Sequence, residues 1–246
     1  MLLPFVTWLL ACSLSTGVPV KSLDGSTSSG NATIPAPASN QTLGEVQSDM
    51  PVQEGDMLVD EDRNAVNMVW GDAIVPYEIN PNVASRTADI LAAFNMIMRS
   101  TCIRFQPHTN EYNYIEIKNG AGCSSFVGCR GGSQPVYFDK TCSVGNLCHE
   151  LIHGLGLFHE HTRPDRDQHI TINWSNIMPG KEGNFEINPG NTLNLPYDYG
   201  SIMHYGSAYF SVDGSPTIVT KEGGSIGQRK QLSQLDAQKL NALYHC

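Results

Sequence analysis

Three histidines lie close together in the stretch HELIHGLGLFH, residues 149–159. His149 and His153 are four positions apart, so on a helix their imidazoles lie on one face, one turn from each other. Gly156 can adopt backbone angles that other residues resist, and the sharp turn that it allows would bring His159 to the same point. Three neutral imidazoles suit zinc and leave a coordination position open for water, as catalytic sites do. The spacing therefore predicts one Zn²⁺ held by these three side chains.

Glu150 directly follows the first of these histidines, so its side chain projects from a helix at a different angle. In this pattern it is placed to reach the water on the metal rather than the metal itself. Zinc lowers the pKa of such a water to about 7. Glu150 can then accept the water's proton during attack on a peptide carbonyl and pass that proton to the leaving amine. The sequence predicts peptide hydrolysis with Glu150 as general base.

A second group of candidate residues is SIMHY, residues 201–205. If Met203 is buried beneath the three imidazoles, it gives the site an apolar floor, a role that is compatible with ordinary core packing. Tyr205 follows two residues later, and its phenol could contact zinc or donate to a developing oxyanion.

An active endopeptidase is not the only class of protein that these residues fit. A catalytically silent relative could bind extracellular protein without cutting it, but Glu150 and the three histidines are intact. A structural zinc module needs four protein ligands, and the sequence offers no strong fourth ligand. We expect an active enzyme and keep the silent binding protein as the alternative.

The histidines need a helix to hold them, and three helices are predicted. Residues 146–154 have the pattern of a helix that ends at glycine. The last helix starts at Ser233, which forms a capping box with Asp236. Another helix is predicted over 86–100, where apolar side chains that we expect in the core recur at helical spacing: Ile90, Leu91, Phe94, Ile97 and Met98.

Strands are predicted over residues 74–79, 114–118 and 136–139. Pro135 cannot donate a hydrogen bond to a strand ladder, so we expect the strand at 136–139 to lie at the edge of its sheet. An extended substrate would add to that edge through main-chain hydrogen bonds.

The N-terminal quarter of the chain differs in composition from the rest. Residues 1–17 resemble a signal peptide, with an apolar run followed by small residues. Residues 18–63 carry −6 of the net charge of −9 and end at Arg63. A composition typical of a folded domain begins near Val66. We therefore predict a propeptide over 18–63, an activating protease that cuts after Arg63, and a catalytic domain over 64–246.

The charge of the chain and the length of its apolar segments also limit the partners that it could bind. An acidic chain without a basic patch is a poor ligand for nucleic acid, and no segment has the length of a transmembrane helix. We predict a secreted glycoprotein that acts on extracellular proteins or peptides, with no nucleic-acid or membrane partner. Three N-x-[ST] sequons agree with export: Asn31, Asn40 and Asn173.

The motifs together resemble one family, the astacin family of metzincins. A long histidine motif with a later methionine turn is the metzincin signature. The stretches that carry the resemblance cover most of residues 66–246: HELIHGLGLFHEHTRPDRD (149–167), SIMHYGS (201–207), TCIRF (101–105), GCSSFVG (122–128) and ITINWSNI (170–177). The resemblance implies an α+β catalytic domain of two lobes with the substrate cleft between them. The upper lobe would hold a twisted mixed sheet and the active-site helix, and the mostly irregular lower lobe would include a C-terminal helix.

The resemblance also implies roles for single residues. The tyrosine matching Tyr205 is a fifth zinc ligand that swings to stabilise the transition state. The glutamate matching Glu160 interacts with the new N-terminus after activation, here Asn64. The propeptide of the family blocks zinc through an aspartate in a Gly-Asp motif. The sequence Glu54-Gly55-Asp56 matches that motif, so Asp56 is the candidate zinc ligand of the zymogen.

Six cysteines remain after the signal peptide, and an even number in a secreted chain implies three disulfides. Two pairs follow from the family resemblance, Cys102–Cys246 and Cys123–Cys142. The chain adds Cys129 and Cys148, and the simplest interpretation is a third bond between them that tethers the active-site helix. A cysteine ligand for zinc is the rival interpretation, which the helical angle of Cys148 disfavours.

Overall fold

A mixed sheet of seven strands forms the framework around which the described residues fold. The computed structural model describes residues 51–59 and 69–246, all within one compact unit of the chain. The strand order in this part is β1-β2-β6-β7-β5-β3-β4. The β1–β2 and β6–β7 pairs are antiparallel and the others are parallel. The bounds are β1 Val52–Gln53, β2 Met57–Leu58, β3 Ile74–Ile79, β4 Arg104–Pro107, β5 Tyr114–Lys118, β6 Cys123–Phe126 and β7 Ser133–Phe138.

Several predictions concern residues outside the described part. These are the signal peptide over 1–17, most of the propeptide, the junction at Arg63, and the sequons at Asn31 and Asn40.

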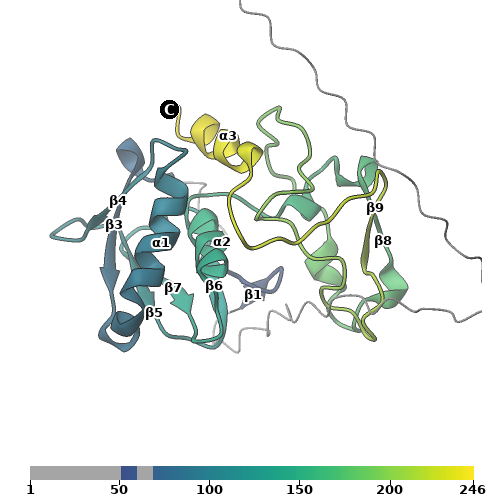
Figure 1. Cartoon of the computed structure of the whole chain (residues 1–246), viewed down its shortest axis with the longest axis horizontal. Helices are drawn as coiled ribbons and strands as arrows, with labels where there is room; N and C mark the ends of the chain where they lie inside the picture. The colour runs from purple at the N-terminus through teal and green to yellow at the C-terminus, as the bar shows by residue number, and fades with distance from the viewer. Residues whose placement is uncertain (1–50, 60–68) are drawn as a thin grey trace, which may run out of the picture. The chain divides into compact units, whose positions relative to one another are not determined.

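Two helices pack on this sheet and beside each other, α1 (Thr87–Met98) and α2 (Val144–Gly154), as Figure 1 shows. In α1 the expected core residues Ile90, Phe94 and Ile97 are buried. Leu91 was expected in the core, but it is 41% exposed. It lies one position past Ile90 and so on the flank of the helix, away from the buried stripe.

The predicted active-site helix is α2. Ser143 accepts a hydrogen bond from the amide of Asn146, and the Asn146 side chain accepts one from the amide of Ser143, which completes a capping box. The helix ends at Gly154, and Gly156 has a φ of +110°, a conformation that favours glycine. The local pattern therefore predicted both the helix and the turn that follows it.

The predicted edge position of the strand near Pro135 is wrong. β7 lies inside the sheet, between β5 and β6. Its pairing with β6 extends from Val136 to Phe138, so Pro135, which lacks an N–H donor, lies just beyond that ladder. On its other side β6 pairs in parallel with β2, so β6 is the strand that would become the edge if segment 51–59 left the sheet. An added substrate strand would therefore meet β6 and not residues 136–139.

A second hydrophobic cluster forms away from the sheet, around Ile170, Phe185 and Tyr209. It contains the antiparallel pair β8 (Ile170–Ile172) and β9 (Ile218–Thr220) and is otherwise irregular. The two clusters agree with the expected two-lobed α+β domain. Short 3-10 helices complete the described structure: Gly71–Ala73, Pro81–Arg86, Glu160–Thr162, Arg166–Gln168, Trp174–Asn176 and Glu182–Phe185.

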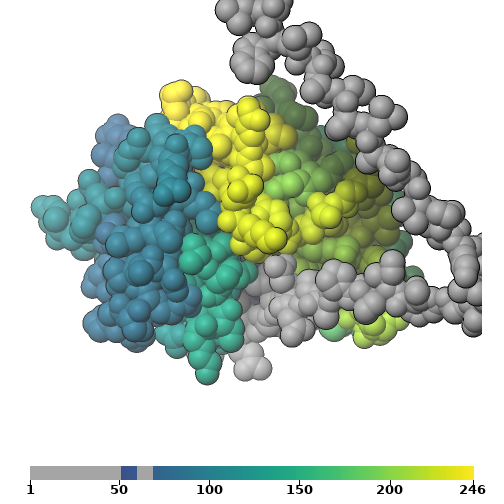
Figure 2. Space-filling view, in the orientation of Figure 1, coloured from purple at the N-terminus to yellow at the C-terminus, as the bar shows by residue number. Residues whose placement is uncertain are grey.

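The chain ends in α3 (Gln234–Leu243), whose Ser233 cap and Asp236 form the predicted capping box. Leu240 of this helix packs into the sheet-side core. Figure 2 shows α3 and the C-terminal residues, in yellow, against the part of the molecule that includes α1. Every helix of the described residues is too short or too polar to cross a lipid bilayer.

The two disulfides expected from the family resemblance are present, Cys102–Cys246 and Cys123–Cys142. The predicted third bond is not, because Cys129 and Cys148 are both buried free thiols. The amide of Gly128 donates to the carbonyl of His153, which holds Cys129 near the C-terminal end of α2. Cys148 lies five residues earlier, about 7.5 Å along the helix axis. The backbone next to Cys129 is thus bonded to α2 about one and a half turns beyond Cys148, and both thiols stay reduced.

Candidate metal centre

The three motif histidines converge as the spacing predicted. The Nε2 atoms of His149 and His153 are 3.1 Å apart, those of His149 and His159 are 3.1 Å apart, and those of His153 and His159 are 3.2 Å apart. All three side chains are buried. Nitrogens bound at 2.0–2.1 Å to one tetrahedral zinc would lie about 3.3 Å apart. The spacing of the imidazoles therefore fits a single zinc ion.

The other ring nitrogen of each histidine fixes which atom faces the centre. Nδ1 of His149 donates to the carbonyl of Ile202 at 2.8 Å, and Nδ1 of His153 donates to the carbonyl of Leu157 at 2.8 Å. Because these Nδ1 atoms carry the protons, the Nε2 lone pairs of the neutral rings point at one another. Such an arrangement is repulsive unless a cation lies between them, so the donor set fits a metal ion.

Asp56 supplies a fourth group at the same point. Its carboxylate oxygens lie 3.2 Å from Nε2 of His149, 3.3 Å from Nε2 of His159 and 3.7 Å from Nε2 of His153. The four side chains form a buried set that could hold a metal ion. Burial alone would raise the pKa of Asp56, but the neighbouring histidines hold it well below its usual range. Asp56 is therefore a carboxylate.

Glu150 is fully buried next to the group formed by Asp56 and the three histidines, but it makes no hydrogen bond to any of them. Among the described residues, neither of its carboxylate oxygens has a hydrogen-bond partner. Burial, and next the charge of Asp56, raise the pKa of Glu150 well above its usual value. A buried carboxyl group without a protein partner, next to a metal set, is free to bond with reacting molecules.

Glu54 entered the sequence prediction only as a neighbour of Asp56, yet it contacts three groups of the site. Its Oε2 accepts a hydrogen bond from Nδ1 of His159 at 2.7 Å and one from the hydroxyl of Thr162 at 3.3 Å. Its backbone carbonyl accepts a hydrogen bond from the phenol of Tyr205. The signal in the sequence was an acidic residue before Gly-Asp, but nothing local indicated these partners.

Gly55 is required between these two acidic residues. Its φ is +78°, and a Cβ there would lie 2.6 Å from the ring of Phe210 and 3.4 Å from the hydroxyl of Tyr205. Only glycine lets the backbone approach the aromatic rings this closely while Glu54 contacts Nδ1 of His159 and Asp56 lies near its Nε2.

Tyr205 is buried, and its ring lies 4.7 Å from that of His159, measured between centroids. Burial, together with the Asp56 and Glu54 charges, raises the pKa of the phenol well above its ordinary value, so it keeps its proton and can donate. In this structure it donates to Glu54.

Met203 and Glu160 hold the part of the chain that carries His159. Met203 is buried in the sheet-side core, and its carbonyl accepts a hydrogen bond from the amide of Glu160 at 3.0 Å. The carboxylate of Glu160 is paired with Lys239 and with Arg163. Asn64, the expected partner of Glu160 after activation, lies outside the described residues.

Comparison with known proteins gives consistent matches. A family model described as Astacin, a family of peptidases, matches residues 62–245. Zinc metalloproteinase nas-14 of Caenorhabditis elegans is 43% identical over 215 residues, which is 78% of this chain and 42% of that protein. Zinc metalloproteinase nas-4 of the same organism is 38% identical over 233 residues, which is 84% of this chain and 74% of that protein. The chain thus spans less than half the length of the first relative and about three quarters of the second.

Solved structures agree with these sequence matches. High choriolytic enzyme 1, a hatching enzyme zinc-protease from Oryzias latipes, aligns with a TM-score of 0.70 at 36% identity. The alignment covers 78% of this chain and 100% of that one. Myroilysin, at 19% identity and a TM-score of 0.53, shares the fold.

Proposed function

This chain belongs to the astacin family, and we propose that it is a secreted zinc-dependent endopeptidase made as a latent precursor. The observation that carries this proposal is the convergence of three Nε2 lone pairs, within 3.2 Å of one another, next to the unpartnered carboxyl group of Glu150. When bound, Zn²⁺ lowers the pKa of a coordinated water to about 7 and polarises a peptide carbonyl.

Glu150 is the general base of the proposed reaction. It accepts a proton from the attacking water and gives it to the leaving amine. Burial is the main cause of the raised pKa of Glu150, and the charge of Asp56 raises it further. Removal of Asp56 therefore lowers the pKa of Glu150 and favours its basic form. Tyr205, once it is released from the carbonyl of Glu54, can donate to the oxyanion of the transition state.

The precursor would be inactive because segment 51–59 occupies three positions that the reaction needs. Asp56 takes the place that a water needs among the histidines, and the carbonyl of Glu54 holds the Tyr205 phenol. β2 pairs with β6, the strand to which a substrate could otherwise add. A protease that cuts near Arg63 would allow this segment to leave all three positions.

The proposed substrates are extracellular proteins. Relatives of this chain include a protein named low choriolytic enzyme, 37% identical over 210 residues, and the hatching enzyme described above. An extracellular role for this chain agrees with the apolar leader at 1–17 and with its two disulfides. Hydrolysis of an egg envelope is one such role.

The test compares activated wild-type protein with a Glu150→Ala variant on a casein substrate. We expect the variant to lose at least about 10²-fold in kcat, because it lacks the general base, while it retains stoichiometric zinc. A chelator should abolish wild-type activity, and added zinc should restore it. If the activated wild type binds zinc and extracellular protein but cuts nothing, the chain is instead the catalytically silent binding relative.

A further inference from the structure

His161 is a buried imidazole to which the proposed reaction gives no role. It lies in the 3-10 helix Glu160–Thr162, two positions after the ligand His159, and is fully buried. Its Nε2 donates a hydrogen bond to the carbonyl of Asn184 at 2.9 Å, whereas its Nδ1 has no partner among the described residues. A buried nitrogen without a partner is destabilising. Packing alone therefore does not explain an imidazole at this position.

The ring of His161 stacks on the ring of Tyr205. The two centroids are 3.8 Å apart, and the planes of the rings differ by 24°. Other rings around Tyr205 meet it edge-on or at a tilt, with centroids 4.7 to 5.9 Å away: His159, Phe185, Tyr209 and Phe210. One face of the phenol that we propose as the oxyanion donor is therefore covered by this imidazole.

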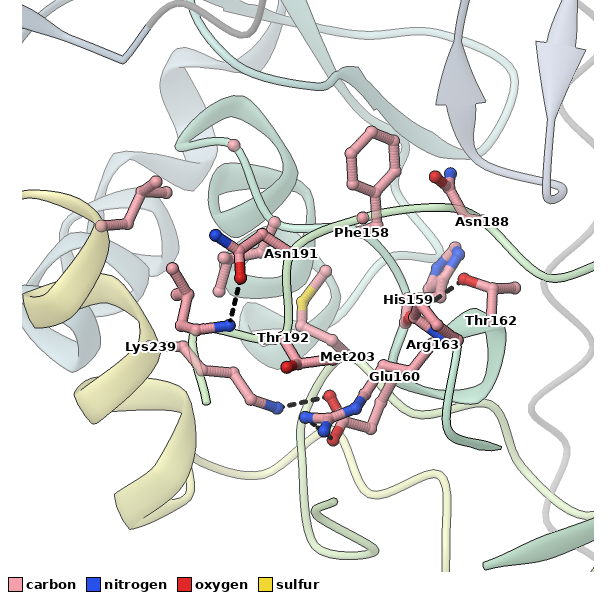
Figure 3. Close-up of a pocket in the computed structure, with 16 residues that line it drawn as sticks. Phe158, His159, Glu160, Thr162, Arg163, Asn188, Asn191, Thr192, Met203 and Lys239 are labelled. Atoms are coloured by element: carbon pink, nitrogen blue, oxygen red, sulfur yellow. Dashed lines mark hydrogen bonds and ion pairs between the residues drawn. The ribbon is translucent and has the colours of Figure 1, made fainter. Parts of the chain in front are cut away.

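The imidazole is held in place through its side chain and its backbone. Nη1 of Arg166 donates to the carbonyl of His161 at 3.2 Å. On either side of His161, the hydroxyl of Thr162 donates to the carbonyl of His159 at 3.0 Å (Figure 3). Together with the bond from Nε2 to Asn184, these contacts fix the plane of the ring relative to the metal ligand.

A fixed, flat neighbour matters because the Tyr205 hydroxyl has to move. In the precursor it donates to the carbonyl of Glu54, and in the proposed reaction it donates to an oxyanion. The Tyr205 ring can slide or turn within its own plane along the imidazole. Tilting out of that plane would push it into His161 or open a gap between the rings. Because an oxyanion donor is effective only at about 2.7–3.1 Å, this restriction keeps the hydroxyl on a useful path.

We propose that His161 is a positioning residue for Tyr205, which guides the phenol from the carbonyl of Glu54 to the oxyanion of the transition state. It acts through the flat face of its ring and not through its protons. The proposal rests on the proposed peptidase function, in which Tyr205 is the donor. A stacked pair of the usual strength corresponds to a factor of about 2–10 in a rate or binding constant.

The first experiment measures kcat and KM of the activated protein with His161→Leu and His161→Phe. Both substitutions remove the bond to Asn184, but only phenylalanine keeps a flat ring against Tyr205. We expect His161→Leu to lower kcat about five- to tenfold with KM within about twofold of wild type, and His161→Phe to keep kcat within about twofold. A wild-type kcat for His161→Leu, or equal losses in both variants, would overturn the proposal.

A double-mutant cycle tests whether the effect of His161 passes through the phenol. Tyr205→Phe removes the hydroxyl and keeps the ring, so the stack remains and only the donor is lost. In this background His161→Leu should not lower kcat further, because no hydroxyl is left to position. If His161→Leu lowers kcat equally with and without the hydroxyl, it acts on the fold or on the metal ligands, and the proposal is wrong.

Phe185→Leu is the matched control for lost packing. Phe185 is fully buried in the same aromatic cluster, but it meets Tyr205 edge-on, with 87° between the ring planes. Its substitution should lower the thermal midpoint, as loss of buried aromatic volume does, and leave kcat within about twofold of wild type with stoichiometric zinc. If Phe185→Leu reduces kcat as much as His161→Leu, any loss of packing in the cluster has this effect, and the proposal is overturned.

The second experiment needs no turnover. A phosphinic peptide carries a tetrahedral, negatively charged centre in place of the scissile carbonyl and so resembles the transition state. Calorimetry should show binding at least about fivefold weaker for His161→Leu than for wild type, and no difference between Tyr205→Phe and the double variant. Wild-type protein that binds the peptide but hydrolyses nothing would contradict the proposed function alone. A His161→Leu protein that binds it as tightly as wild type would overturn the role of His161, even in an active peptidase.

Discussion

Among the three histidines, His159 is the one whose Nδ1 partner belongs to segment 51–59. His149 and His153 donate through Nδ1 to carbonyls of Ile202 and Leu157, whereas His159 donates to the side chain of Glu54. Departure of the segment would remove Asp56 from all three histidines, but it would remove the Nδ1 partner of His159 alone. The carboxylate of Glu54 is thus a second attachment for the segment, separate from Asp56.

The first prediction at this scale is that Glu54→Ala weakens latency. The variant keeps the backbone carbonyl for Tyr205 but loses a charge-assisted hydrogen bond of about 1.5–3 kcal/mol. Unactivated precursor should therefore hydrolyse a small fluorogenic peptide at least about tenfold faster than wild-type precursor. Gln53→Ala is the control, because Gln53 is exposed on β1. If the Glu54→Ala precursor is as inactive as the wild-type precursor while an Asp56→Ala precursor is active, Asp56 alone inhibits the site.

The second prediction concerns His204, which is buried between Tyr197 and the backbone of Tyr205. Burial, with the charge of Arg229, lowers the pKa of His204 to about 3, against 6.5 for the unfolded chain. A depressed pKa means that the contribution to stability is complete above pH 6.5 and is lost as pH falls toward 3. Between pH 6.5 and 5 the loss should be about 2 kcal/mol in the free energy of unfolding.

Urea unfolding at pH 7 and pH 5, in chelator so that metal release does not contribute, tests this expectation. His204→Gln should be less stable than wild type at pH 7 but should lose less stability on acidification. Equal losses in both proteins would show that His204 does not titrate on unfolding in this range.

At the scale of elements, β2 pairs with β6 as an added strand. The segment that carries β2 can lie this close to Phe210 because residue 55 is glycine. We predict that a synthetic peptide of residues 51–59 inhibits the activated enzyme, and that Gly55→Ala raises its inhibition constant at least about tenfold. The substitution combines a strained positive φ with a close contact to Phe210, together about 2 kcal/mol. A Gln53→Ala peptide is the matched control. Equal inhibition by all three peptides would contradict the close approach of the Gly55 backbone to Phe210.

Local patterns were enough to predict the elements that hold the ligands. α2, the turn at Gly156 and the Ser233 cap of α3 each depend on residues within one short window, where spacing and capping chemistry decide the conformation. Contacts between distant segments were not predictable in this way. No local signal showed that β6 pairs with β7 or that Cys129 and Cys148 stay as free thiols.

The same distinction applies to the candidate site. The three histidines, Glu150 and the approach of Asp56 followed from motifs. The bond from His159 to Glu54 and the pair of Lys239 with Glu160 join residues 105 and 79 positions apart. Side-chain partners at such separations depend on how the whole chain packs, and one sequence does not specify them.

For the whole molecule, α3 is the element that connects the distant parts. It packs Leu240 into the sheet-side core, reaches the metal loops through Asp236 and Lys239, and is followed by the disulfide from Cys246 to Cys102. Metal retention and the stability of the fold should therefore change together when α3 is perturbed at its metal-facing side.

The most direct test of the account is the zinc content of purified, folded chain, measured by mass spectrometry of the metal beside a His149→Ala/His153→Ala double variant. We predict one zinc ion per wild-type chain, in the precursor and after activation, and almost none in the variant. A folded wild-type protein without stoichiometric zinc, or a double variant that retains it, would contradict a metal centre built from these imidazoles.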